Sequence, residues 1–182
     1  LTACASAPAS TATPAPTESP ASTAETLTLE QKVGQLFIVR PDALDLTLSQ
    51  ETIDDPRADG VTQVTDAMRE TLQQYPVGGI CQFGKNIESP SQLARFNKDL
   101  QAASATPLFI TVDEEGGMVA RLANNDAFDL PRYASAAAVG ASGDPENARA
   151  MGQTIGGYLK TYGFNMDFAP DADVNTNPDN PI

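Results

Sequence analysis

Acidic residues and a glycine pair follow a short apolar run in the middle of the chain. Leu108–Val112 is apolar or β-branched without alternation, which predicts a buried strand of a parallel sheet. The acids at 113–115 come directly after it, and Gly116-Gly117 let the backbone turn sharply or approach a ligand. Carboxylates at the carboxyl end of such a strand lie where α/β barrels build their active sites. The segment therefore predicts a site for a polar ligand with many hydroxyl groups, such as a sugar.

The neighbouring acids Glu114 and Glu115 could be read as the two carboxyl groups of a glycosidase. Adjacent residues of an extended strand point to opposite faces, so these two cannot flank one glycosidic bond together. We therefore do not expect these two residues to form a catalytic pair.

Composition excludes several functional classes. The net charge of the 182 residues is −13, which argues against binding nucleic acid, whose phosphates need Lys and Arg. The chain has no histidine, so it contains neither a Ser-His-Asp triad nor a histidine-rich zinc site. No cofactor is expected. No apolar run reaches the roughly 18 residues that would span a membrane.

Strand and helix patterns alternate about four times along residues 27–182. This alternation predicts an α/β fold with a parallel sheet and helices outside it. An open doubly wound sheet and half of an eight-stranded barrel both fit the periodicity, but no glycine fingerprint follows the first strand, and the acids at strand ends favour the barrel. The predicted strands are 36–39, 77–83, 108–113 and 164–169, and the predicted helices begin at Thr28, Val64, Ser89 and Asp144.

Other segments have simpler interpretations. Residues 41–61 are polar and are expected to form a loop excursion. The face of Leu93, Phe96 and Leu100 is expected in the core, and Cys81 is expected as a small buried apolar residue. Asp167, Asp171 and Asp173 cluster after the fourth strand, but their spacing is not that of a hard-cation site. We expect no metal there, and expect Asp173 and Asn175 to hold the loop through backbone hydrogen bonds.

Both ends of the chain carry signals of their own. Leu1-Thr-Ala-Cys4 resembles a bacterial lipobox, and residues 5–26, nearly all Ala, Ser, Thr, Pro and Glu, predict a disordered tether. Lipidation at Cys4 is the expectation, with an ordinary disordered N-terminus as the alternative. The other end stops in a turn-rich stretch at 175–182. We expect a partial sequence, the alternative being a deliberately shortened chain.

Several motifs in order resemble one family. They are residues 33–37, 77–80, 84–86, 112–121, 162–170 and 173–178. Together they resemble the N-terminal barrel domain of glycoside hydrolase family 3, over residues 27–182, and most of all its bacterial β-N-acetylhexosaminidases. The resemblance implies a disordered tether at 1–26 followed by about four βα units, the N-terminal portion of a TIM (β/α)8 barrel.

The resemblance also implies roles for two residues. Asp113 matches the aspartate that grips hydroxyls of the terminal sugar, and Arg121 matches an arginine that reaches the same sugar. The family usually has arginine where this chain has Met118, which removes one nearby cation. Glu114 and Glu115 match positions with structural roles.

The resemblance places the bond-breaking residues elsewhere. The nucleophile is an aspartate on a later strand, the acid/base is a histidine on a loop, and a further sugar-binding arginine follows; all are expected downstream of Ile182. We expect the full-length protein to hydrolyse terminal β-linked N-acetylhexosamine residues with retention, and this chain alone to be inactive. The alternatives are a β-glucosidase or β-xylosidase of the same family, or a non-catalytic sugar-binding lipoprotein. The lipobox implies the bacterial cell envelope, outside the cytoplasm, with membrane attachment only through Cys4.

Overall fold

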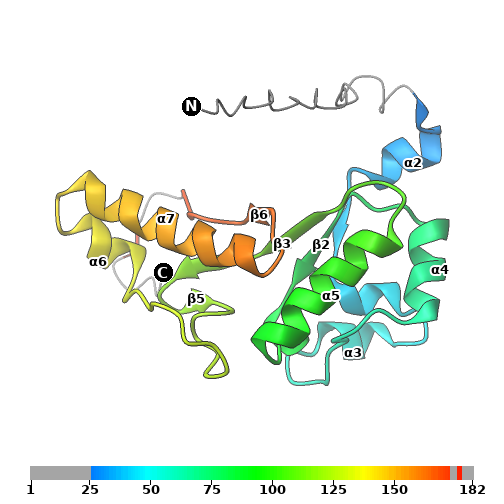
Figure 1. Ribbon diagram of the computed structural model, residues 1–182, viewed down its shortest axis with the longest axis horizontal. Coiled ribbons are helices and arrows are strands. Elements are labelled where there is room, and N and C mark those ends of the chain that lie inside the picture. The colour runs from blue at the N-terminus through cyan, green and yellow to red at the C-terminus, as the bar shows by residue number, and fades with distance from the viewer. Residues whose placement is uncertain (1–25, 173–175, 178–182) are drawn as a thin grey trace, which may run out of the picture.

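The computed structural model describes residues 26–172 and 176–177. At its centre lies a four-stranded sheet whose neighbouring strands all run parallel, in the order β1-β2-β3-β6 (Figure 1). The strands are β1 (Ile38–Val39), β2 (Gly79–Gln82), β3 (Phe109–Val112) and β6 (Met166–Asp167). This order follows the chain without reversing, whereas a doubly wound sheet reverses at its switch point. The arrangement is therefore that of part of a barrel, and all four predicted strands are present, though shorter than predicted.

The four predicted helices are also present, and their caps explain where they begin. Thr28 forms a capping box with Gln31, accepting from its backbone N–H while the Gln31 side chain accepts from the N–H of Thr28. Ser89 and Asp144 cap helices that open with proline, which lacks the N–H that a first turn leaves unpaired. The helix predicted from Val64 begins two residues later, after the cap Thr65. The helices are α2 (Leu29–Gly34), α4 (Asp66–Gln74), α5 (Pro90–Ala103) and α7 (Pro145–Thr161).

Four segments differ from the sequence-based prediction. The excursion at 41–61 is not only a loop, because it contains the 3-10 turn η1 (Pro41–Leu44) and the short helix α3 (Gln50–Asp54). The acids after β3 enter a hairpin of β4 (Glu114–Gly116) and β5 (Val119–Ala120). The additional short elements are η2 (Gly84–Asn86) and α6 (Ala136–Gly140). These pieces are too short to show a clear hydrophobic period, so the sequence pattern does not predict them.

The core lies between the sheet and the helices. The expected face of α5 is confirmed, since Leu93, Phe96 and Leu100 are all buried in one apolar cluster with strand residues such as Ile80 and Ile110. In Figure 1, α5 lies across β2 and β3. The sheet is thus packed against α5 through its central strands, β2 and β3. These two strands also share the longest paired stretch, four residues on each strand.

Apolar side chains remain exposed near the outer strands. Leu36 is 82% exposed and Phe37 is 56% exposed beside β1, and Phe168 is 41% exposed after β6. Leu29 and Val33 of α2 are exposed as well, so this first helix adds no side chain to the core. No helix in the described part of the chain has both the length and the apolar character needed to cross a membrane.

Candidate functional site

The carboxyl ends of the parallel strands bring charged and aromatic side chains to one edge of the sheet. Arg40, Phe83 and Asp113 are each the first residue after a strand, following β1, β2 and β3 respectively. Because the three strands are parallel neighbours, these residues lie along the same edge. This is the edge at which barrels of this type place their sites.

The hairpin returns a fourth side chain to that edge. Gly116 and Gly117 have φ angles of 83° and 59°, so the turn uses backbone conformations that L side chains rarely adopt. Arg121 follows β5 directly, and its Nη2 donates to Asp113 Oδ2 at 3.1 Å. The side chains of Asp113 and Arg121 are 27% and 31% exposed, so the pair is partly buried and open to a ligand. The two residues singled out in the sequence are therefore in direct contact.

Glu114 is engaged by the protein itself. Its Oε2 accepts from the backbone N–H of Leu122 at 2.8 Å, and its Oε1 accepts from the N–H of Ala123 at 2.9 Å. The hydroxyl of Tyr158 donates to Oε1 at 2.8 Å, and burial, together with this hydrogen bond, raises the pKa of Tyr158 so that it stays a neutral donor. Glu114 is fully buried and holds the chain beyond Arg121 to helix α7.

The neighbouring Glu115 faces elsewhere. One of its oxygens accepts from the backbone N–H of Asp171 at 2.9 Å, while Glu114 is sealed in the interior. Glu114 is thus occupied by hydrogen bonds in the interior, whereas Glu115 contacts the segment that follows β6.

Asp167 ends strand β6 beside these acids. Its Oδ1 accepts from the backbone N–H of Glu114 at 3.0 Å. Burial raises the pKa of Asp167 to about 6, opposed by that hydrogen bond and reinforced by the nearby carboxylates of Glu114, Asp113 and Glu115. Among the described residues, no three His, Cys, Asp or Glu side chains are grouped to hold a metal ion. Asp173 and Asn175, expected to brace the following loop, lie outside the described residues, as does Cys4.

Two residues at the carboxyl ends of the strands, Arg40 and Phe83, were not predicted as site residues from the sequence. The Arg40 guanidinium lies 4.8 Å from the centroid of the Phe83 ring, and that of Arg121 lies 5.9 Å from it, so both make cation–π contacts. Their signal was positional, since Arg40 directly follows one predicted strand and Phe83 is the last residue of the next. Cys81, expected to be buried, is only half-buried, and this burial raises the pKa of its thiol.

The chain matches the model of the glycosyl hydrolase family 3 N-terminal domain over residues 28–182, which is most of its length. It belongs to glycoside hydrolase family 3. The fold of this family 3 domain is α/β with a parallel sheet, and it corresponds to the first part of the family's TIM barrel, as predicted.

Known relatives of this family 3 domain are hexosaminidases. It is 32% identical over 165 residues to β-hexosaminidase A of Pseudoalteromonas piscicida, covering 86% of this chain and 27% of that protein. It is also similar to the family 3 β-N-acetylglucosaminidase of Paenibacillus sp. str. FPU-7, with a TM-score of 0.65 and 36% identity, covering 86% of this chain and 26% of that one.

A third relative was solved with a sugar derivative. The structure is that of NagZ from Neisseria gonorrhoeae in complex with N-trifluoroacetyl-D-glucosamine, with a TM-score of 0.53 and 25% identity, covering 60% of this chain and 33% of that one. The family 3 domain described here thus spans about a quarter to a third of the length of these relatives.

Proposed function

We propose that the gene product containing this chain hydrolyses terminal β-linked N-acetylhexosamine residues with retention, and that Asp113 and Arg121 hold the terminal sugar. The observation that carries the proposal is the partly exposed ion pair of Asp113 and Arg121, which lies at the carboxyl end of β3 in a family 3 domain. An ionised carboxylate accepts charge-assisted hydrogen bonds from adjacent hydroxyls. Arg121 can offer donors to the same sugar, because its guanidinium lies against Asp113 and its side chain is 31% exposed.

The relatives support the choice of sugar. The similar proteins named above are hexosaminidases, and one was solved with a glucosamine derivative. We propose terminal N-acetylhexosamine residues, in sugars of the peptidoglycan type, as the substrate class of this protein.

The bond-breaking groups are proposed to lie outside these 182 residues. A retaining glycosidase needs a nucleophile and an acid/base about 5 Å apart across the bond. Glu114 is taken up by hydrogen bonds within the protein, and the chain has no histidine. This chain by itself is therefore proposed to hold the sugar without cleaving it.

Hydrolysis of a chromogenic N-acetyl-β-glucosaminide tests both statements. The gene product should turn the substrate over and the purified 182-residue chain should not. Asp113→Asn in the gene product should lower kcat/KM about ten- to a hundredfold, since hydrogen bonds to a charged group contribute about 1.5–3 kcal/mol. Asp126→Asn is the matched control, because that aspartate is 95% exposed and its ion pair is with Arg132, away from the proposed sugar contacts.

Two outcomes would contradict the proposal. Turnover by the pure 182-residue chain would show that the reacting groups lie within it. Equal rates in Asp113→Asn and Asp126→Asn would remove Asp113 from sugar recognition.

The same assay separates the competing functions. Faster turnover of a β-glucoside or β-xyloside than of the N-acetyl substrate would favour those specificities. Saturable binding of N-acetylglucosamine by calorimetry without any turnover would favour a non-catalytic sugar-binding lipoprotein.

We also propose that Cys4 carries a lipid anchor in the bacterial cell envelope. The support is the lipobox-like start and the Ala/Ser/Thr/Pro-rich stretch after it. Metabolic labelling with a radioactive fatty acid should mark the gene product and should fail in Cys4→Ser; equal labelling of both would reject the anchor.

A further inference from the structure

The side chain of Asp167 extends the pairing of β3 and β6 by one hydrogen bond. In the parallel register Asp167 lies opposite Val112, the last residue of β3. The Val112 carbonyl accepts from the backbone N–H of Phe168 at 2.9 Å, and the N–H of Glu114 donates to Asp167 Oδ1 at 3.0 Å. In a regular parallel ladder a backbone carbonyl would accept from that second N–H. A carboxylate therefore replaces a backbone group where β3 leaves the sheet.

These two hydrogen bonds flank Asp113. One is made by the residue before Asp113 and the other by the residue after it, and both partners belong to the end of β6. The backbone of Asp113 is thereby fixed on both sides at the point where the chain turns into the hairpin. Because the rotamers open to a side chain depend on its backbone dihedral angles, the place of the Asp113 carboxylate depends on these two bonds.

The ion-pair partner of Asp113 is held from the same place. The carboxylate of Glu114 accepts from the backbone N–H groups of the two residues that follow Arg121. The backbone N–H of the same Glu114 is the group that Asp167 binds. Glu114 thus connects the two members of the pair, and Asp167 holds Glu114 to β6.

Asp167 itself faces away from the pair. Its side chain lines two hollows beside α7, one of which it shares with Leu159 and Lys160. Arg121 lines a different hollow, together with Phe83. Asp167 is therefore placed to act on a ligand of the pair through the backbone that it binds, and not by touching the ligand.

Asp167 is surrounded by groups that oppose its negative charge. The charged and titratable groups that face it from the segment after β3 and from α7 are Asp113, Glu114, Glu115, Tyr158 and Lys160. Burial raises the pKa of Asp167 to about 6; the hydrogen bond from the Glu114 N–H opposes this rise, and the three acids reinforce it. No ion pair in the described part of the chain includes Asp167. Acids with opposed charge cluster at functional sites.

We propose that Asp167 is a positioning residue that sets the Asp113 carboxylate and, through Glu114, the Arg121 guanidinium for the sugar. The proposal rests on the proposed function, in which that pair holds the terminal sugar. The ionised form of Asp167 performs this role, because a carboxylate accepts from an N–H group more strongly than a neutral carboxyl or amide does. Sugar binding therefore tightens as the pH rises through the range in which Asp167 loses its proton, whereas the contribution of Asp167 to folding stability falls.

The KM of the gene product for a chromogenic N-acetyl-β-glucosaminide tests this role. The ratio of KM in Asp167→Asn to KM in wild type cancels the titration of other groups. The ratio should be near one at about pH 5 and about threefold at pH 7, because the amide accepts the same hydrogen bond without a charge. The kcat values should differ less than the KM values, since the pair binds the sugar and breaks no bond. Asp126→Asn, at a 95% exposed aspartate, should give a ratio of one at both pH values.

Stability measured on the same variants separates positioning from a merely structural role. A structural residue would lose sugar affinity together with stability. Asp167→Asn should instead gain stability relative to wild type as the pH rises and lose relative sugar affinity over the same range. Asp167→Ala, which removes the acceptor, should raise KM at both pH values.

Two results would count against the proposal in different ways. A KM ratio for folded Asp167→Asn that is the same at the two pH values would overturn the positioning role and leave the proposed function intact. A wild-type gene product that cleaves no N-acetyl-β-glucosaminide would overturn the proposed function, and the positioning role with it.

Discussion

Asp113 and Glu114 are adjacent acids with opposite surroundings. Asp113 is 27% exposed and meets a single arginine, whereas Glu114 is sealed inside and accepts three hydrogen bonds from protein groups. A carboxylate saturated in this way is a structural anchor, and its neighbour keeps acceptor capacity for a ligand. The alternation of strand side chains separates the two roles within one dipeptide.

The contribution of the Asp167 side chain to folding stability depends on pH. Burial raises its pKa in the folded protein to about 6 from 3.8, so the folded state binds a proton that the unfolded chain has already released. Asp167 therefore contributes stability below about pH 4 and loses it as the pH rises through about 6. The Asp167→Asn side chain resembles the protonated carboxyl. The variant should therefore become more stable relative to wild type as the pH rises from about 4 to 7.

Thermal unfolding of the gene product across that pH range measures the difference. The free energy of unfolding of Asp167→Asn should rise relative to wild type by about 1 kcal/mol. A pKa change from 3.8 to about 6 would give more for a fully buried group, but this carboxyl is only half-buried and water screens it. Asp126→Asn, at an exposed aspartate, should show a constant difference from wild type. A constant difference for Asp167→Asn as well would refute the raised pKa.

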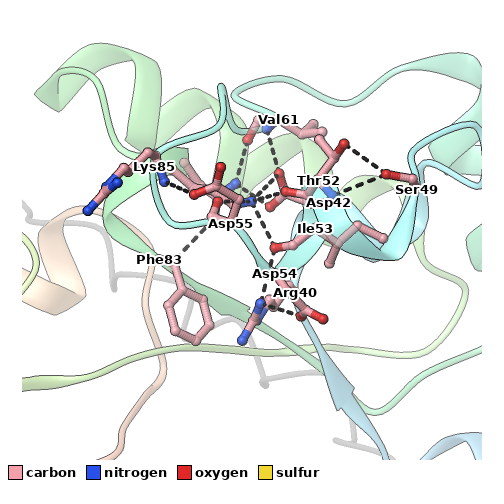
Figure 2. Close-up of polar contacts among 12 residues, drawn as sticks. Arg40, Asp42, Ser49, Thr52, Ile53, Asp54, Asp55, Val61, Phe83 and Lys85 are labelled. Atoms are coloured by element: carbon pink, nitrogen blue, oxygen red, sulfur yellow. Dashed lines mark hydrogen bonds and ion pairs between the residues drawn. The ribbon is translucent and has the colours of Figure 1, made fainter.

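At the scale of elements, the excursion at 41–61 depends on one side chain from another segment. Lys85 comes from the η2 turn after β2 and binds three carbonyls of the α3 region (Figure 2). Lys85→Met removes those donors and leaves Asp42 buried without its cation, which should cost about 3–5 kcal/mol. Much of this loss should appear as local opening of the excursion.

Limited proteolysis of the gene product reports on that opening. Cleavage within residues 45–60 should become faster in Lys85→Met, while Lys98→Met, at an exposed lysine of α5, should cleave like wild type. Equal cleavage in the two variants would mean that the excursion is held by something other than Lys85.

At the scale of the whole molecule, the sheet has two outer strands. In the described part of the chain, β1 and β6 each pair with a strand on one side only. Unpaired strand edges and the exposed Leu36, Phe37 and Phe168 favour association. The 182-residue chain on its own should therefore self-associate or lack a cooperative fold.

Light scattering after gel filtration of the 182-residue chain checks this expectation. Phe37→Asp should reduce association, because it places a charge at the β1 edge. Met118→Asp, at a residue 71% exposed on the hairpin, should not. A monomer with a sharp two-state thermal transition would contradict the expectation.

Much of the fold was predictable because its signals are local. Helix caps such as Thr28, Ser89 and Asp144, and continuous apolar runs for the strands, depend only on neighbouring residues. The hairpin after β3 was missed because tertiary contacts, such as those of Glu114 with Leu122 and Ala123, stabilise strands too short to show a pattern.

The family, the alternation of strands and helices, and the candidate pair Asp113 and Arg121 could be read from the amino-acid sequence, because each lies in contiguous motifs. The contact between Asp113 and Arg121, the burial of Glu114, and the shared edge of Arg40 and Phe83 emerge only in the folded chain. The same holds for the contacts by which Lys85 fixes the excursion at 41–61. These facts depend on strand register and on contacts between residues tens of positions apart, which short-range sequence patterns do not encode.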